Sequence, residues 1–305
     1  MEDVRVSIFM LTYNQEEYIG QTIESVLSQN ASFKYQLVIG EDCSTDNTRS
    51  ICEKYANENK EKIKLLPSKE NLGLINNFIR TFKECDGKYV AICDGDDYWI
   101  DPFKLQKQFD FLESNPDYSI VHTNLNFLYP NGKFHLKNTL GLKKERDFED
   151  LVFENTIPSV TAFFRNKQHK EESPKWIAKF PYGDWPIYLW TIKDGSRIGF
   201  LEDVTAVYRK EIGVSEKLKK RPSDIAKVNL EIVSCIYEDV KFSNKKHIIK
   251  KSLEKHKSAL LACYFREKKY LKSLRLAFKL AKDYPKKVVK LYAYLIKRKI
   301  LNSKN

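Results

Sequence analysis

Over the first hundred residues, short runs of hydrophobic residues alternate with longer segments in which hydrophobic residues recur at helical spacing. Short apolar runs of the length of a buried strand lie at residues 6–11, 37–39, 63–66 and 89–92. Segments with apolar residues at helical spacing follow the first three runs, at residues 16–28, 48–55 and 74–84. Strands that alternate with helices at this spacing predict an α/β fold whose parallel sheet is covered on both faces.

The pattern is less regular after residue 102. It predicts helices at 103–112, at a short segment opened by Asp147 and again just after Asp184, and strands at 119–123, 157–165 and 204–209. Apolar residues on both sides of Pro130-Asn131-Gly132 predict a hairpin over 127–135. His122, on one of these strands, is expected to be a packed side chain rather than a ligand.

The last quarter of the chain is predicted to be helical and differs in charge from the rest. Residues 1–215 carry 27 Lys and Arg against 33 Asp and Glu, whereas residues 216–305 carry 26 against 8. Three apolar stripes begin at Ile225, Leu253 and Tyr270, and Pro285 separates the last helix from them. We therefore predict a domain over 1–215 and a basic helical region over 216–305.

Composition narrows the class of protein. The six cysteines are far apart and form no Cys-x-x-Cys pair, which argues against a zinc site or a dense disulfide framework and favours reduced thiols. No apolar run approaches the roughly 20 residues that span a bilayer. The acidic start enters a strand almost at once, so we expect no signal peptide and a cytoplasmic location.

An acidic cluster follows the apolar run at 89–92. Asp94, Asp96 and Asp97 place three carboxylates within four residues. Carboxylates this close resist ionising together unless a cation lies among them, and oxygen ligands suit Mg²⁺ or Mn²⁺. The alternative is an Asp-rich surface turn, which Asp and Gly also favour.

Polar residues end two other predicted strands. Thr12 follows the first strand and Asp42 the second. Ligands of such sheets bind beyond the carboxyl ends of the strands, so these residues and the acidic cluster are expected to line one crevice. The alternative is that Thr12, Asp42 or Asp46 caps a following helix.

Taken together, these motifs resemble those of the family 2 glycosyltransferases, which have the GT-A fold. The matching segments are Thr12-Tyr13-Asn14, residues 41–46, Asn71-x-Gly73, and Asp94-Gly95-Asp96-Asp97 followed by Pro102. Glu41 and Cys43 replace the first Asp and the Gly of the usual Asp-Asp-Gly-Ser-Thr-Asp segment. The resemblance covers roughly residues 4–215. It implies a Rossmann-like mixed sheet flanked by helices, with the basic helices as an appendage.

The resemblance assigns a nucleotide-sugar site to the strand ends. Thr12 and Asp42 would contact the uracil of a UDP-sugar, with Asp42 accepting from the ring N–H. Glu16 or Tyr13 would border the base or ribose. Asn14 and Asn71 belong to the same predicted site.

At the diphosphate end, Asp94 would face the ribose and donor sugar beside Gly95. Asp96 would bind the divalent metal, Mn²⁺ or Mg²⁺, and Asp97 would assist it. Arg209 would lie near the diphosphate. Lys210 replaces the histidine that often follows this arginine, which puts metal ligation there in doubt, and Gly213 and Ser215 come next.

Asp184 is the candidate general base. In the family, an acidic residue here takes the proton from the acceptor hydroxyl, which attacks opposite UDP and inverts the anomeric configuration. The alternative is that Asp184 is the N-cap of the helix that follows, and both can hold together. Trp99 and Trp185 are expected either to contact the acceptor sugar or to be buried.

The function that follows is transfer of a sugar from UDP to a glycan or lipid-linked acceptor in cell-surface polysaccharide biosynthesis. The basic helices would hold the protein at an anionic membrane, peripheral to its inner face; binding of nucleic acid is not expected. Two alternatives are a non-catalytic scaffold and a nucleotidyltransferase. Against a dinucleotide enzyme, no Gly-x-Gly-x-x-Gly follows the first strand.

Overall fold

The computed structural model describes residues 4–137, 143–212 and 221–302. The chain divides into two compact units, Met1–Leu218 and Lys219–Asn305. The segment between the two predicted domains, including Gly213 and Ser215, lies outside the described residues. Within the described ranges, no helix combines the length and the apolar character needed to cross a bilayer.

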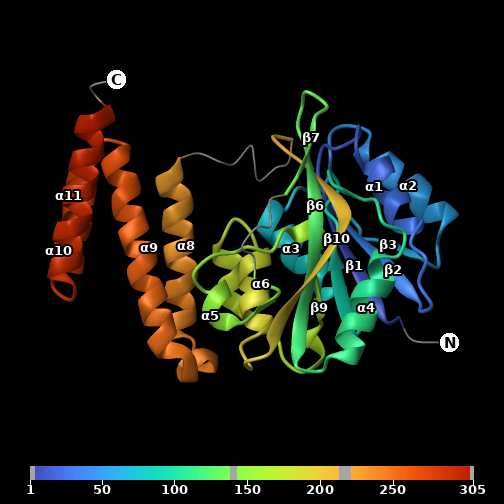
Figure 1. Ribbon diagram of the computed structural model, residues 1–305. Coiled ribbons are helices and arrows are strands. Elements are labelled where there is room, and N and C mark those ends of the chain that lie inside the picture. The colour runs from blue at the N-terminus through green and yellow to red at the C-terminus, as the bar shows by residue number, and fades with distance from the viewer. Residues whose placement is uncertain (1–3, 138–142, 213–220, 303–305) are drawn as a thin grey trace. The chain divides into compact units, whose positions relative to one another are not determined.

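The first unit is built on one mixed sheet (Figure 1). Its strands are β1 (Val6–Thr12), β2 (Tyr35–Glu41), β3 (Ile63–Leu65), β4 (Tyr89–Ile92), β5 (Tyr98–Trp99), β6 (Tyr118–Leu128), β7 (Phe134–Leu136), β8 (Glu145–Arg146), β9 (Phe163–Arg165) and β10 (Arg197–Arg209). The main order is β3-β2-β1-β4-β9-β6-β10-β5. The first four strands are parallel, as predicted, while β9 pairs antiparallel with both β4 and β6.

Helices cover both faces of this sheet (Figure 1). On one face, alternate β1 residues such as Ile8 and Met10 pack with buried residues of α1 (Ile19–Leu27), α2 (Thr48–Glu58) and α4 (Lys104–Ser114). On the other, Phe9 of β1 contacts Phe78 of α3 (Leu74–Lys83), and Phe164 of β9 contacts Tyr188 of α6 (Asp184–Thr191). The side-chain alternation of a strand produces this division.

Several details can be compared with the sequence predictions. The hairpin is confirmed: β6 and β7 pair antiparallel, and Gly132 has a φ of 77° in the turn. His122 is fully buried, as expected. The short helix α5 (Phe148–Leu151) begins after Asp147, whose carboxylate caps it. The strand predicted over 157–165 is wrong in its first half, because a 3₁₀ turn, Ser159–Thr161, precedes β9.

The second unit consists of helices. They are α8 (Pro222–Glu238), α9 (Lys246–Arg266), α10 (Tyr270–Ala281) and α11 (Pro285–Asn302), with a 3₁₀ segment, Val240–Lys245, before α9. Leu261, Ala277, Leu280 and Leu295 form a core that joins the last three helices. The stripe predicted from Tyr270 is only partly correct, because Leu271 and Leu274 are exposed.

Candidate functional site

The ends of β1, β2 and β4 meet at one edge of the sheet. Strand β1 lies between the other two. The Asp42 N–H donates to the Thr12 carbonyl over 3.1 Å, and the Gly95 N–H donates to the Leu11 carbonyl over 2.8 Å. Thr12, Asp42 and the acidic loop 94–97, which are far apart in sequence, are therefore neighbours in the fold.

Asp42 is held by the loop that carries Asn71. Its two carboxylate oxygens accept from the Leu72 N–H at 2.8 Å and the Gly73 N–H at 3.0 Å. The Asn71 amide donates to the Asp42 carbonyl over 2.9 Å. Burial raises the pKa of Asp42, although the two backbone N–H groups favour its charged form. The carboxylate is therefore buried and fixed in orientation.

The two departures from the family motif have clear places in the structure. Glu41 is fully buried, and its carboxylate accepts from the Ser44 N–H at 2.6 Å and lies 3.6 Å from Arg49. Cys43 has a φ of 58°, in the left-handed region that glycine adopts most readily. Glu41 thus stabilises the loop after β2, and Cys43 takes the backbone conformation of the glycine it replaces.

Asn14 and Glu16 connect the loops after β1 and β2. The Asn14 side-chain oxygen accepts from the Thr45 N–H at 2.9 Å. The Glu16 carboxylate accepts from the Asn47 N–H at 2.8 Å, just before α2. Tyr13, which precedes Asn14, is half-buried. The structure thus gives Asn14 and Glu16 a positioning role, and the predicted contacts of Tyr13, Asn14 and Glu16 with a nucleotide stay predictions.

The acidic loop packs tightly on β1. A Cβ atom at Gly95 would lie 2.7 Å from the Thr12 hydroxyl and 2.6 Å from the Gln15 side-chain oxygen, so the approach requires glycine. Both of those polar atoms are buried without a hydrogen-bond partner among the described residues. From α1, the Thr22 hydroxyl lies 2.6 Å from the Asp97 carbonyl and 2.9 Å from the Gly95 carbonyl.

The three carboxylates of this loop have different surroundings. Burial and the neighbouring Asp96 raise the pKa of Asp94 to about 7, although the Ser159 hydroxyl donates to it over 3.2 Å. Burial and Asp96 also raise the pKa of Asp97, which accepts from the Arg209 N–H at 2.9 Å. Asp97 is thus a structural residue of the loop, while Asp94 and Asp96 concentrate negative charge at the site.

The side chains of the acidic loop can be compared with those that bind a divalent metal. Among the described residues, no three His, Cys, Asp or Glu side chains are arranged to hold a metal ion. However, Mg²⁺ is commonly held by one or two carboxylates together with substrate phosphates. The half-buried Asp94 and the buried Asp96 repel each other, which is the situation that a cation relieves. These residues fit a metal shared with a nucleotide diphosphate.

Arg209 holds the acidic loop from the other side. Its guanidinium lies between the rings of Tyr18 and Tyr98, at 4.8 and 4.7 Å. It donates to the Asp96 carbonyl over 2.5 Å and also contacts Gln21. The buried guanidinium therefore positions the loop, and the predicted contact with the diphosphate stays a prediction.

Asp184 is the first residue of α6. The N-cap is Gly183, so the alternative that Asp184 caps the helix is wrong by one position. The Asn155 amide donates to the Asp184 carboxylate over 2.9 Å. Burial raises the pKa of Asp184 despite hydrogen bonds from the Trp185 backbone and Asn155. The charge of Asp184 also contributes to the raised pKa of Asp94, which places the two carboxylates in one electrostatic environment.

The two tryptophans do not have the predicted acceptor role. Trp99 and Trp185 are both buried. Their indole N–H groups donate to backbone carbonyls, of Val160 at 3.0 Å and of Leu151 at 2.9 Å. The predicted contact with a sugar is corrected for both, because their faces are packed in the protein core.

Several residues of the site carried no sequence signal. Ser159, Asn155 and Thr22 contact acidic or backbone groups of the site from other elements. Tyr188 is fully buried, and its hydroxyl has no partner among the described residues. Burial is the main reason that the pKa of Tyr188 is raised, and the negative charges of Asp184 and Asp94 raise it further. The one sequence feature that could have suggested Tyr188 is its position one turn after Asp184 on the predicted helix.

A group of cations lies beside the loop that carries Asn155. Lys137 donates to the Thr156 carbonyl over 3.3 Å, and Arg146 contacts the Thr156 hydroxyl and His122. The pKa of Lys137 is lowered to about 8, mainly by burial and further by the positive charges of Arg146 and Lys210. Lys210 itself lies 4.4 Å from the centre of the Phe127 ring. Positive charge is thus concentrated next to the segment that positions Asp184.

Solved structures share this fold. Staphylococcus aureus TarS 1–349 in complex with UDP-GlcNAc superposes with a TM-score of 0.68 over 94% of this chain and 84% of that one, at 21% identity. A Pyrobaculum calidifontis mannosyltransferase in complex with GDP-Man and Mn²⁺ gives 0.59 over 97% and 86%, at 17% identity. These similarities confirm the predicted mixed sheet of GT-A type.

Sequence relatives match part of this chain. An uncharacterized protein of Mycobacterium tuberculosis is 29% identical over 206 residues, which are 67% of this chain and 58% of that protein. The chain thus spans less than two thirds of this relative. The Escherichia coli UDP-Glc:alpha-D-GlcNAc-diphosphoundecaprenol beta-1,3-glucosyltransferase is 32% identical over 46% of this chain and 50% of its own length.

The sequence profile of glycosyl transferase family 2 matches residues 7–171. This range covers more than half of the 305-residue chain, and it includes the ends of β1, β2 and β4 described above. The chain therefore belongs to glycosyl transferase family 2.

Proposed function

We propose that this protein transfers a sugar from a UDP-sugar to a hydroxyl of a glycan or lipid-linked acceptor, with inversion and with a divalent metal. The observation that carries the proposal is the shared environment of Asp94 and Asp184, which come from different elements. One carboxylate lies at the predicted donor site, and the other is fixed by Asn155. A site for single displacement needs acidic groups in these two places.

In this proposal, Asp42 and Thr12 bind the uracil, and the acidic loop lies against the diphosphate and donor sugar. Asp184 accepts the acceptor's proton while the acceptor oxygen bonds to the anomeric carbon and the bond to UDP breaks. Asn155 holds the carboxylate toward the acceptor, and the raised pKa of Asp184 makes it a better base. A metal bound by Asp96 would neutralise the charge that develops on the leaving diphosphate.

The class of acceptor and the location are inferred more broadly. The E. coli relative is named for a diphosphoundecaprenol-linked acceptor, which supports a lipid-linked acceptor and a role in cell-surface polysaccharide synthesis. A lipid-linked acceptor requires the enzyme to work at a membrane surface. We infer a cytoplasmic enzyme that is peripheral to the membrane, held there by its basic helices.

The test separates donor binding from transfer. Asp96→Ala should abolish metal-dependent UDP binding in calorimetry with and without Mn²⁺. Asp184→Asn should leave UDP binding unchanged but slow transfer by roughly 100-fold or more. The exposed Asp117→Asn is the matched control. Normal transfer by Asp184→Asn would refute the base assignment, and UDP binding that ignores both Mn²⁺ and Asp96 would refute the metal site.

A further inference from the structure

Helix α10 is apolar on two faces. Ala277 and Leu280 are buried in the core of the helical unit. The neighbouring face carries Leu271, Leu274 and Phe278, whose side chains are 75%, 44% and 73% exposed. The spacing i, i+3, i+7 places these three residues in one stripe along the helix. An exposed helix face would ordinarily be polar, so this stripe needs a partner.

Helix α11 repeats the feature. Leu295 faces the core, whereas Val289 and Ile296, seven residues apart, are 69% and 47% exposed. Because residues seven apart lie on one side of a helix, α11 also has an apolar stripe that the described residues leave uncovered. The hairpin formed by α10 and α11 therefore exposes large aliphatic and aromatic side chains on both of its helices.

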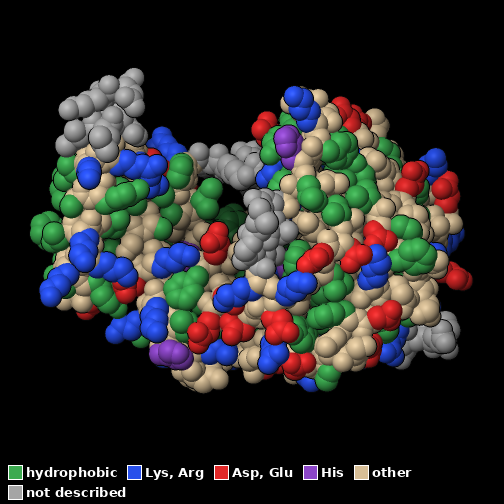
Figure 2. All heavy atoms as spheres, viewed as in Figure 1, with side chains coloured by type: hydrophobic (Ala, Val, Ile, Leu, Met, Phe, Trp, Pro, Cys, Tyr) green, Lys and Arg blue, Asp and Glu red, His purple; other side chains and the backbone are tan. Residues whose placement is uncertain are grey.

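The same hairpin is strongly basic. Residues 270–302 contain ten Lys and Arg but only one acidic residue, Asp283. Arg275 and Lys282 are exposed and lie four residues after Leu271 and Phe278, so they flank the α10 stripe. Figure 2 shows Lys and Arg side chains mixed with hydrophobic ones over these helices. This combination complements a surface that is anionic outside and apolar beneath.

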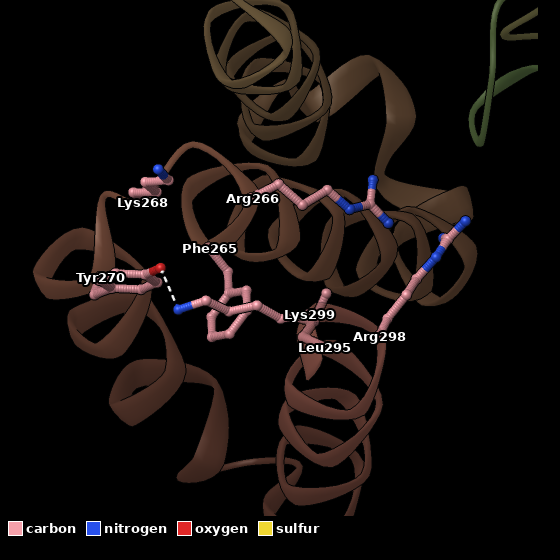
Figure 3. A pocket seen from close by; sticks show the side chains of 7 residues that line it. All are labelled: Phe265, Arg266, Lys268, Tyr270, Leu295, Arg298 and Lys299. Carbon is pink, nitrogen blue, oxygen red and sulfur yellow. Dashed lines mark hydrogen bonds between the residues drawn. The ribbon is translucent and has the colours of Figure 1, made fainter. Parts of the chain in front are cut away.

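A cavity of about 720 Å³ lies where α9, α10 and α11 meet (Figure 3). Its polar lining is cationic: Arg266, Lys268, Arg298 and Lys299. None of the four has an ion pair with a carboxylate among the described residues; Lys299 donates to the Tyr270 hydroxyl over 2.8 Å, and Arg298 to that of Tyr294 over 3.2 Å. Phe265 and Leu295 supply the apolar lining. Guanidinium and ammonium groups over an apolar wall fit a phosphate ester that carries a hydrocarbon part.

We propose that the α10–α11 hairpin docks on an anionic phospholipid bilayer, with its apolar stripes in the acyl region and a lipid phosphate in the cavity. This makes specific the membrane contact of the proposed function. Docking requires no sugar transfer, and transfer to a soluble acceptor requires no docking. Vesicle binding and UDP binding can therefore fail separately, so each proposal has its own test.

The experiment is flotation of the full chain with vesicles. Binding is expected to vesicles of phosphatidylglycerol and phosphatidylcholine in equal parts, and to weaken with added salt. Leu271→Ser/Phe278→Ser should lower the partition coefficient roughly tenfold or more. The control Phe134→Ser/Leu136→Ser changes two side chains of the first unit that are 55% and 60% exposed, and it should have no effect. Arg266→Gln/Arg298→Gln should reduce the preference for phosphatidylglycerol over pure phosphatidylcholine.

Circular dichroism checks that each variant keeps its helices. Failure of the wild-type chain to float with phosphatidylglycerol would overturn the proposal. So would equal binding by Leu271→Ser/Phe278→Ser. If the chain instead forms oligomers that this double substitution dissolves, as read by light scattering without lipid, the stripe is an interface between copies and the lipid assignment is wrong.

Discussion

The acidic residues at the carboxyl ends of the strands and the basic residues of the α10–α11 hairpin differ in how much of their charge is exposed. At the strand ends, Asp42 and Asp97 are buried, Asp94 and Asp184 are half-buried, and each of the four accepts a hydrogen bond from the protein. On the hairpin, charges are mostly exposed and few have acidic partners. Buried, bonded charges are fixed before a ligand arrives, as catalysis requires. Exposed charges cost little and suit association with a surface.

The largest effect on the acidic loop is expected from Gly95→Ala. The new methyl group would overlap the Thr12 hydroxyl and the Gln15 side chain, so the loop must move. We expect sugar transfer from the UDP-sugar to fall by about 100-fold, because small displacements of reacting groups are costly, and stability to fall by about 1–3 kcal/mol. Transfer assays and urea titration measure both. Gly20→Ala, in helix α1 and with its nearest new contact Tyr55 at 3.8 Å, should leave transfer unchanged and raise stability by up to about 1 kcal/mol.

Arg209→Met removes the charge that fixes the acidic loop while retaining a long apolar side chain. The loss of the hydrogen bond to the Asp96 carbonyl should cost about 2–3 kcal/mol of unfolding free energy. Metal-dependent UDP affinity, measured by calorimetry, should fall roughly tenfold. The exposed Arg197, whose ion pairs are long, provides the control as Arg197→Met. Equal effects of the two substitutions would contradict a special role for Arg209.

Lys104 sharpens the contrast, because it is a fully buried cation. Its ammonium donates to Gln108 over 2.6 Å, and burial lowers its pKa from 10.5 to about 7. Between pH 7 and 10 the unfolded chain holds this proton more tightly, so stability should rise with pH by up to about 1.4 kcal/mol per unit. Below pH 7 this contribution should level off.

In urea titrations from pH 7 to 10, Lys104→Met should flatten this rise. Lys107→Met is the control, because carboxylates of Asp101 and Asp203 raise the pKa of Lys107. Its contribution is therefore present throughout this range and is lost only above it. An unchanged slope in Lys104→Met would mean that Lys104 stays charged in the folded protein.

The smallest effect is expected on the exposed stripe. Leu271→Ala should change the unfolding free energy by no more than about 0.5 kcal/mol. Leu280→Ala, on the buried face of the same helix, should cost about 2–5 kcal/mol. A large cost at Leu271 would show that its side chain is covered within the protein and would weaken the docking proposal.

The sequence was most informative where local pattern and function coincide. Thr12, Asp42 and Asp94 end apolar strands, so their meeting at one edge followed from the topology of a parallel sheet. Asn155 and Ser159 reach the site through tertiary packing from an irregular segment, which has no periodicity to read. The burial of Trp99 and Trp185 depended on neighbours from distant parts of the chain in the same way.

The short antiparallel strand β9 lies in the middle of the sheet. It separates β4, whose loop carries the acidic cluster, from β6, and the turn before it brings Ser159 to Asp94. Segment 154–159 takes no part in the pairing of β1 with β2 and β4, so we expect that pairing to persist if the segment is exchanged for that of a relative. A chimera of this kind would change the contacts that Asn155 makes with Asp184 and Ser159 makes with Asp94, while keeping the strands that hold Thr12 and Asp42.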